Sequence, residues 1–169
     1  ILDAAKVNQG KLTLKKTEGD VGALIRDEIK LFASEAKGKN ITVTANVAPA
    51  IPNFFFDKIR ISEALSNIMS NSLKYTNENG LIKLTARPQG KNLLVVISDN
   101  GVGIPENKKK DLFKKYSQLN SSHQKISSGL GLYITKWIID AHKGEIHVES
   151  KEGEGTTTFI TLPLSTKAS

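Results

Sequence analysis

The pattern of apolar and polar positions predicts a chain in which helices and strands are mixed without strict alternation. Apolar residues at helical spacing predict helices over residues 20–36, 57–75, 109–116 and 129–142, and every-second-residue patterns predict strands over residues 11–16, 41–47, 81–87, 92–98, 145–150 and 156–164. Short turns join the last two pairs of strands, so most of the sheet should be antiparallel. The sequence therefore predicts an α+β fold, a two-layer α/β sandwich whose mixed, mostly antiparallel sheet carries three main helices on one face.

Composition and charge narrow the range of functions. The chain of 169 residues has no cysteine, which excludes a disulfide scaffold, cysteine-ligated zinc and a thiol nucleophile. Its formal net charge is +7, but only three of the 24 basic residues are Arg, the residue preferred for contacts to phosphates and bases of nucleic acid. The basic residues are spread along the chain, so we expect solvated surfaces and no nucleic-acid partner. No apolar run approaches the roughly 18 residues of a membrane helix.

The predicted helix over residues 57–75 carries a polar stripe with an unusual composition. At about 100° per residue, Asn67, Asn71 and Lys74 fall on one side together with Arg60 and Glu63. The opposite side is apolar and should face the core, with Ile61, Leu65, Ile68, Met69 and Leu73. Asn is a poor helix former, but its amide oxygen can ligate a hard cation, and a Lys can contact phosphate. The stripe therefore indicates a binding site rather than an ordinary solvated surface.

Two glycine-containing segments carry further candidate chemistry. Asp99 follows the predicted strand over residues 92–98, and Gly101 and Gly103 come directly after it. A carboxylate only accepts hydrogen bonds, so it suits an exocyclic amino group such as that of adenine, and glycines let backbone approach a flat ligand. The second segment opens the helix predicted over residues 129–142, where free N–H groups suit phosphate. Its glycine spacing differs from that of the phosphate-loop and dinucleotide motifs.

The order of these motifs, followed by Gly153-Glu154-Gly155-Thr156 before the last strand, resembles the ATP-binding catalytic domain of sensor histidine kinases. That family shares its nucleotide fold, the Bergerat fold, with DNA gyrase, the heat-shock chaperone ATPases and the mismatch-repair ATPases. The resemblance implies three segments. Residues 1–14 would be the end of an upstream dimerisation helix and a linker strand, residues 15–164 the catalytic domain, and residues 165–169 a tail.

The resemblance also implies roles for the residues at the adenine ring. Asp99 would bind the adenine amino group, and Gly101 and Gly103 would shape the pocket. Thr156 would share a water molecule with Asp99. ATP and Mg²⁺ are the cofactors that this family uses.

Other residues would hold the phosphates and the metal. Asn71 would ligate Mg²⁺, Asn67 and Lys74 would contact the phosphates, and Tyr75 would flank them. The backbone at the start of the last helix would cradle the phosphate tail, through Ser128, Gly129, Leu130, Gly131 and Leu132. The polar segment 117–128 would form a lid, and its Gln118 stands where hybrid kinases, which carry their own receiver domain, often have Gln.

The implied activity is transfer of the γ-phosphate of ATP to a histidine on a separate dimerisation domain, and from there to a response-regulator receiver domain. Related ATPases carry a water-activating Glu where this chain has Asn67, and an amide cannot take a proton, so hydrolysis should be slow. His123, His142 and His147 each lack the acidic neighbour of a phosphoacceptor. We therefore expect a monomeric fragment that binds ATP without phosphorylating itself, from a homodimeric protein whose catalytic domain is cytoplasmic, with or without a membrane anchor.

Three alternatives remain open from the sequence. One is a degenerate module of the same fold that binds nucleotide without chemistry, and another is a protein serine kinase of that fold. A nucleic-acid binder rests only on the net charge, and steep salt dependence of DNA binding would identify it.

Overall fold

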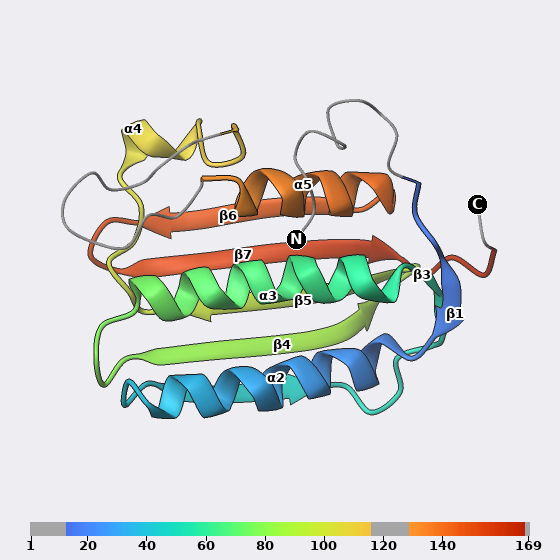
Figure 1. Ribbon diagram of the computed structural model, residues 1–169, viewed down its shortest axis with the longest axis horizontal. Coiled ribbons are helices and arrows are strands. Elements are labelled where there is room, and N and C mark those ends of the chain that lie inside the picture. Colours follow the sequence, from blue (N-terminus) through green and yellow to red (C-terminus); the bar gives the residue numbers. More distant parts are fainter. Residues whose placement is uncertain (1–12, 116–128, 168–169) are drawn as a thin grey trace.

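The computed structural model describes residues 13–115 and 129–167. Figure 1 shows the described elements as a sheet with helices packed on one side. In chain order they are β1 (Thr17–Gly19), α2 (Val21–Lys37), β2 (Thr42–Val47), β3 (Phe54–Phe56), α3 (Lys58–Tyr75), β4 (Leu81–Gln89), β5 (Asn92–Asp99), α4 (Glu106–Lys109), α5 (Gly131–Ala141), β6 (Glu145–Lys151) and β7 (Gly155–Pro163).

The main sheet has the strand order β2-β4-β5-β7-β6. Its β2–β4 pair is parallel and the other three pairs are antiparallel, while β1 and β3 form a separate antiparallel pair. Helices α2, α3 and α5 lie on the same face of the main sheet (Figure 1). The predicted α+β fold, with a mostly antiparallel mixed sheet and three main helices on one face, is confirmed.

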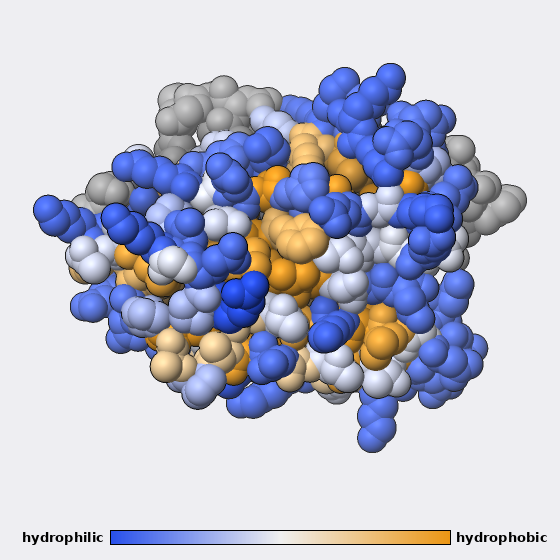
Figure 2. Space-filling view, turned by 180° about the vertical axis from the view of Figure 1, so that it is seen from behind, coloured by the Kyte–Doolittle hydropathy of each residue, from blue (hydrophilic) through white to orange (hydrophobic). Residues whose placement is uncertain are grey.

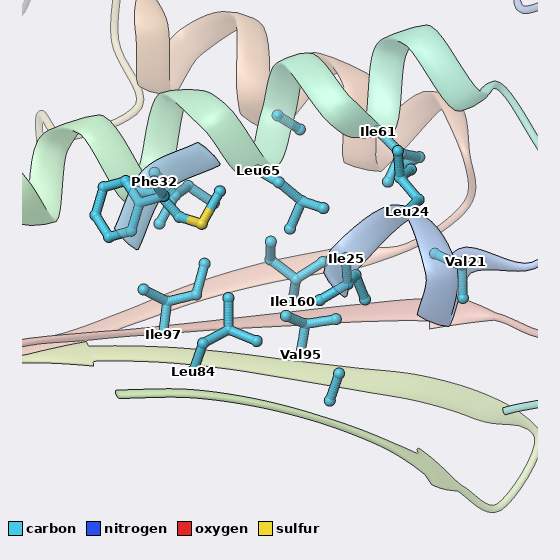
Figure 3. Packing of buried hydrophobic residues seen from close by; sticks show 14 of the residues in the cluster. Val21, Leu24, Ile25, Phe32, Ile61, Leu65, Leu84, Val95, Ile97 and Ile160 are labelled. Carbon is cyan, nitrogen blue, oxygen red and sulfur yellow. The ribbon is translucent and has the colours of Figure 1, made fainter. Parts of the chain in front are cut away.

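The core lies between this helical layer and the sheet. Side chains from β4, β5 and β7 point toward side chains from α2 and α3 (Figure 3). Those labelled on the sheet side are Leu84, Val95, Ile97 and Ile160, and each of them is buried. The helical layer contributes Ile25, Phe32, Ile61 and Leu65, which are also buried. The packing of these apolar side chains fixes α3 over the centre of the sheet.

None of the described helices covers the opposite face of the main sheet (Figure 1). Leu94 and Val96 of β5 lie there with Phe159 of β7, which is paired with Val96, and each of the three is half-buried. Figure 2 shows this face, with apolar side chains gathered in the middle and polar side chains around them. Among the described residues, no helix combines the length and apolar character needed to cross a membrane.

Two aspartates begin the long helices as the sequence predicts. The Asp20 carboxylate accepts a hydrogen bond from the Ala23 N–H at 2.9 Å, and the Asp57 carboxylate accepts one from the Arg60 N–H at 3.1 Å. Such N-caps satisfy N–H groups that the first helical turn leaves without partners. The observed helices, Val21–Lys37 and Lys58–Tyr75, agree with the predicted ranges to within about a residue.

Two predicted element ranges are wrong. The strand expected over residues 11–16 is not a strand at residues 13–16, and pairing begins at β1, because β3 offers partners only to Thr17–Gly19. The helix expected over residues 109–116 is replaced by α4, which starts directly after Pro105, followed by turns through residue 115. Proline favours a helix start because its φ is already set.

Two smaller differences concern helices α2 and α5. The spacing of apolar residues in the first helix predicts Leu31 on its buried side. Leu31 is instead 73% exposed, because it lies about 110° around the helix from the stripe centred on Ile25 and Phe32. Helix α5 begins at Gly131 rather than at residue 129, because Gly129 has a φ of +63°, which a right-handed helix does not allow.

Asp57 and His142 join the start of α3 to the end of α5. The Asp57 carboxylate also accepts a hydrogen bond from the Lys15 N–H at 2.7 Å, and the Asp57 N–H donates to His142 Nε2 at 3.0 Å. His142 Nδ1 donates to the Ile138 carbonyl at 2.7 Å, since a carbonyl can only accept. The imidazole is therefore neutral, with its proton on Nδ1.

Burial lowers the pKa of His142, and the nearby charge of Lys16 lowers it further, whereas the Ile138 carbonyl and the Asp57 carboxylate oppose the shift. Above about pH 6.5 the folded and unfolded states are both neutral at this residue. Below this pH the unfolded chain takes up a proton before the folded protein does. The free energy of unfolding should therefore decrease as the pH is lowered, by at most about 1.4 kcal/mol per pH unit. Denaturant unfolding of the wild type and His142→Gln at pH 8 and pH 5 should show the larger acid loss in the wild type. Equal losses in the two proteins would contradict this account of His142.

Candidate nucleotide-binding site

A cavity of about 290 Å³ opens beside α3, between the loop 100–105 and the start of α5. The structure brings nine of the residues singled out in the sequence to its walls, namely Asn67, Asn71, Tyr75, Asp99, Gly103, Gly129, Gly131, Leu132 and Thr156. Among the described residues that line it, Asp99 is the only carboxylate. These residues come from segments that are far apart in the sequence.

The Asp99 carboxylate lies at the last residue of β5 and is half-buried. Its Oδ1 accepts hydrogen bonds from the Gly101 N–H at 3.0 Å and from the Thr156 N–H at 3.2 Å. Burial raises the pKa of the Asp99 carboxyl, while hydrogen bonds from Gly101, the Ser72 side chain and Thr156 lower it. The charged form is thus held by several donors, and the carboxylate is fixed in position.

The glycines of the loop 100–105 allow close approach of backbone segments. A Cβ on Gly101 would lie 2.3 Å from the Tyr75 carbonyl oxygen, so this glycine seats the loop against the end of α3. Gly101 does not line the cavity; its N–H is directed to Asp99. Gly103 has a φ of +67°, and a Cβ there would lie 2.0 Å from the Lys151 carbonyl oxygen. Neither position could accept a larger residue without movement of the backbone.

Helix α3 supplies the polar wall of the cavity. Asn67, Asn71 and Tyr75 follow one another at four-residue spacing and all line it. Asn67 Nδ2 lies 3.5 Å from the Gly131 carbonyl oxygen and 3.4 Å from Thr135 Oγ1, so it reaches across to α5. The helix therefore connects the start of α5 to the loop that follows Asp99.

Lys74 is on the same helix but is not among the residues that line the cavity. Its ammonium nitrogen lies 5.2 Å from the centre of the Tyr75 ring, which is a cation–π distance. The structure places this charge beside the cavity and next to a residue of its wall.

The first turn of α5 forms another part of the wall. Gly129, Gly131 and Leu132 line the cavity, whereas Leu130 packs against the apolar core. Leu130 is the N-cap residue and makes no side-chain capping hydrogen bond. Helix N-termini with free N–H groups attract anions through these donors and the helix dipole. Ser128 and the expected lid over residues 117–128 lie outside the described residues.

Much of the remaining cavity wall is apolar, and the sequence did not indicate that these residues belong to the site. It includes Ile68, Val102, Ile104, Leu112 and Val148. Apolar residues scattered over four different segments leave no local signal in a sequence. Ser72, which holds Asp99, was also missed, because a serine within a helix is common and its role depends on a tertiary contact.

The donor set does not make a site for a free metal ion. The described residues contain no group of three or more His, Cys, Asp or Glu side chains that could hold one. Mg²⁺ usually keeps several waters and is held by few protein oxygens together with substrate phosphates. Asn71 lines the cavity, and its amide oxygen could be one of the few protein oxygens that hold Mg²⁺ together with substrate phosphates.

Comparison with known proteins agrees with this geometry. A family model described as histidine kinase-, DNA gyrase B-, and HSP90-like ATPase matches residues 56–166. The adaptive-response sensory kinase SasA of Synechocystis sp. is 31% identical over 97% of this chain, which spans 43% of SasA. The alginate biosynthesis sensor protein KinB of Pseudomonas aeruginosa is 28% identical over 97% of the chain, which spans 27% of KinB. The chain thus spans less than half of each of these relatives.

Solved structures show the same fold. Full-length ShkA in complex with AMPPNP superposes with a TM-score of 0.84 at 25% identity, covering 98% of this chain and 34% of ShkA. The catalytic domain of histidine kinase ThkA gives a TM-score of 0.78 at 29% identity, covering 90% of this chain and 97% of that domain. ThkA in complex with the response regulator protein TrrA gives a TM-score of 0.76 at 26% identity, covering 96% of this chain and 46% of that chain. The chain therefore belongs to the family of histidine kinase-, DNA gyrase B- and HSP90-like ATPases, as a catalytic domain of the sensor histidine kinase type.

Proposed function

We propose that the cavity binds ATP with Mg²⁺ and presents its γ-phosphate to a histidine on a separate dimerisation domain. The observation that carries the proposal is the arrangement of polar groups along the cavity. The half-buried Asp99 carboxylate lies at one end, and the side-chain amides of α3 lie at the other with the start of α5, which has no side-chain cap. Asn67 and Tyr75 are separated by eight residues, or about 12 Å of helix. That length suits a nucleotide with its base beside Asp99 and its phosphates beside α5. The AMPPNP bound in ShkA supports this assignment.

The part of the cavity formed by Asp99, Gly103 and Thr156 is the proposed base end, and Gly101 seats the loop behind it. Asp99 accepts a hydrogen bond from the adenine amino group, because its carboxylate has no hydrogen to donate. Gly101 and Gly103 let the loop backbone approach the ring, and apolar side chains cover its faces. Thr156, whose N–H is bonded to Asp99, offers its hydroxyl to a water shared with Asp99.

The part formed by Asn67, Asn71 and residues 129–132 is the proposed phosphate end, and Ser128, which precedes Gly129 in the sequence, is a further proposed phosphate-binding residue. The N–H groups at the start of α5 donate to phosphate oxygens. Lys74 and Tyr75 flank the phosphates from the end of α3 nearer the base, and Asn67 donates its amide hydrogens to them at the end nearer α5. Asn71 is the protein ligand of Mg²⁺, and the ion, when bound with the nucleotide, neutralises phosphate charge.

The fate of the γ-phosphate follows from the side chains in the cavity. Among its described residues, Asp99 is the only carboxylate and there is no histidine, and Asp99 lies at the base end. Neither Asn67 nor Asn71 can take a proton from water, so the domain hydrolyses ATP slowly. The acceptor is instead a histidine supplied by the dimerisation domain, followed by a receiver domain, as the ThkA complex with TrrA suggests for a relative.

The proposed organisation of the protein places this domain at residues 15–164. Residues 1–14 end a dimerisation helix and link it to the domain, and residues 165–169 are a tail. The protein acts as a homodimer through the dimerisation helices, and this domain acts in the cytoplasm, where ATP is available.

The base end is tested with Asp99→Asn. An amide oxygen can still accept from the Gly101 and Thr156 N–H groups, but the amide nitrogen presents donors to the adenine amino group. Titration calorimetry with ADP should show affinity weakened about tenfold or more, the effect of a lost charge-assisted hydrogen bond. Asp140→Asn is the matched control, because Asp140 is exposed on α5 and pairs with Lys136 at 3.0 Å. Unchanged ADP affinity in Asp99→Asn would contradict the assigned base end.

The transfer is tested by incubation with radiolabelled ATP. The full-length parent protein should acquire phosphate that acid removes and alkali does not, as expected of phosphohistidine, while this chain alone should acquire none. Acid-stable phosphate would instead identify a serine kinase of the same fold. Nucleotide binding without any transfer by the full-length protein would identify a binding module, and both results would contradict the proposal.

A further inference from the structure

The turn between β6 and β7 packs directly against the loop 100–105. The Gly153 N–H donates to the Val102 carbonyl at 2.8 Å. A Cβ on Gly155, whose φ is +107°, would lie 2.0 Å from the Asp99 carbonyl oxygen. The hairpin and the loop therefore meet without side chains between them, and the position of one determines the position of the other.

The Ser150 hydroxyl lies at the centre of this contact. Its Oγ accepts a hydrogen bond from the Ile104 N–H at 2.9 Å and donates one to the Gly155 carbonyl at 2.7 Å. The same oxygen lies 2.9 Å from Thr156 Oγ1. A serine hydroxyl has one hydrogen and two lone pairs, so these three contacts use its full capacity.

The count of hydrogens settles the direction of the third bond. The single Ser150 hydroxyl hydrogen points to the Gly155 carbonyl, which cannot donate. Thr156 Oγ1 must therefore be the donor to Ser150, and its lone pairs are what remain for the cavity that it lines. Beside it, Asp99 is also an acceptor. The Asp99 carboxylate and the Thr156 hydroxyl thus both present acceptors to the base end.

We propose that Ser150 is a positioning residue that holds the Thr156 hydroxyl as an acceptor toward the cavity, and that it thereby favours bases with an exocyclic amino group over bases with a carbonyl at that position. The inference rests on the proposed function, because it requires the base to lie beside Asp99 and Thr156. Ser150 itself does not touch the ligand; it acts through the Thr156 hydroxyl.

The test compares adenosine diphosphate with inosine diphosphate, which carries a carbonyl in place of the amino group. In Ser150→Ala the Thr156 hydroxyl is free to turn and donate to that carbonyl. The ratio of the dissociation constant of inosine diphosphate to that of adenosine diphosphate should therefore fall about fivefold or more, which is the effect of about one hydrogen bond. A loss of folded protein lowers the number of sites for both nucleotides alike, so the ratio reports discrimination and not stability.

Three variants complete the test. Ser98→Ala is the matched control, because Ser98 Oγ lies 2.8 Å from Thr157 Oγ1, a similar serine–threonine pair formed by residues that do not line the cavity. It should leave the ratio unchanged, and Ser150→Thr, which keeps the hydroxyl, should retain most of the discrimination. In a Thr156→Val background, Ser150→Ala should change the ratio no further.

The outcomes separate the two hypotheses. If the wild type binds adenosine diphosphate and Ser150→Ala keeps the wild-type ratio, the role of Ser150 is wrong and the proposed function stands. A further fall of the ratio in the Thr156→Val background would also overturn the role, because Ser150 would then act by another route. If the wild type binds neither nucleotide, the proposed function itself fails.

Discussion

The half-buried carboxylate of Asp99 is the group on which the base end depends, since a charge in this position requires several donors to hold it. Two of those donors are backbone N–H groups, from Gly101 in the following loop and from Thr156 at the start of β7. The Thr156 N–H reaches the carboxylate because β5 and β7 are paired with Asp99 opposite Thr156, whereas the Gly101 N–H comes from the loop directly after Asp99. The register of the sheet thus places the carboxylate, and the carboxylate in turn fixes the loop and the hairpin that surround the cavity.

Helix α3 connects the core to the site. One side carries buried residues such as Ile61, Leu65 and Met69, which pack in the layer between the helices and the sheet. The other side carries Asn67 and Asn71 toward the cavity. Because the apolar side fixes the rotation of the helix, it also fixes the direction of the amides. The Asp57 carboxylate and His142 hold the other end of this helix, away from the cavity.

The sequence was sufficient to predict the fold class and the residues whose chemistry is unusual for their local setting. Asp99 before two glycines and two Asn within a helix are such cases, and the structure brings Asp99 and both Asn to one cavity. Ser150 is a different case, because a serine in a strand is ordinary. Its three hydrogen bonds arise only when the hairpin packs on the loop 100–105.

The wrong ranges predicted for the strand over residues 11–16 and the helix over residues 109–116 also arise from contacts that form only in the folded protein. Residues 13–16 alternate like a strand, but they have no strand partner, and the Lys15 N–H bonds to Asp57 instead. The lysine-rich segment after Pro105 has helical composition, yet its hydrogen bonds beyond α4, such as Leu112 to Lys109, are those of turns. Periodicity predicts which residues share a side, whereas the end of an element depends on which partners the fold supplies.

The central claim is that a nucleotide lies along α3 with its base beside Asp99. A crystal structure of this domain with Mg²⁺ and a non-hydrolysable ATP analogue tests it most directly. The account predicts the adenine amino group at hydrogen-bond distance, about 2.7–3.2 Å, from the Asp99 carboxylate, with the amide oxygen of Asn71 bound to Mg²⁺. A nucleotide bound with its base away from Asp99, or with its phosphates away from Asn71 and the start of α5, would contradict it.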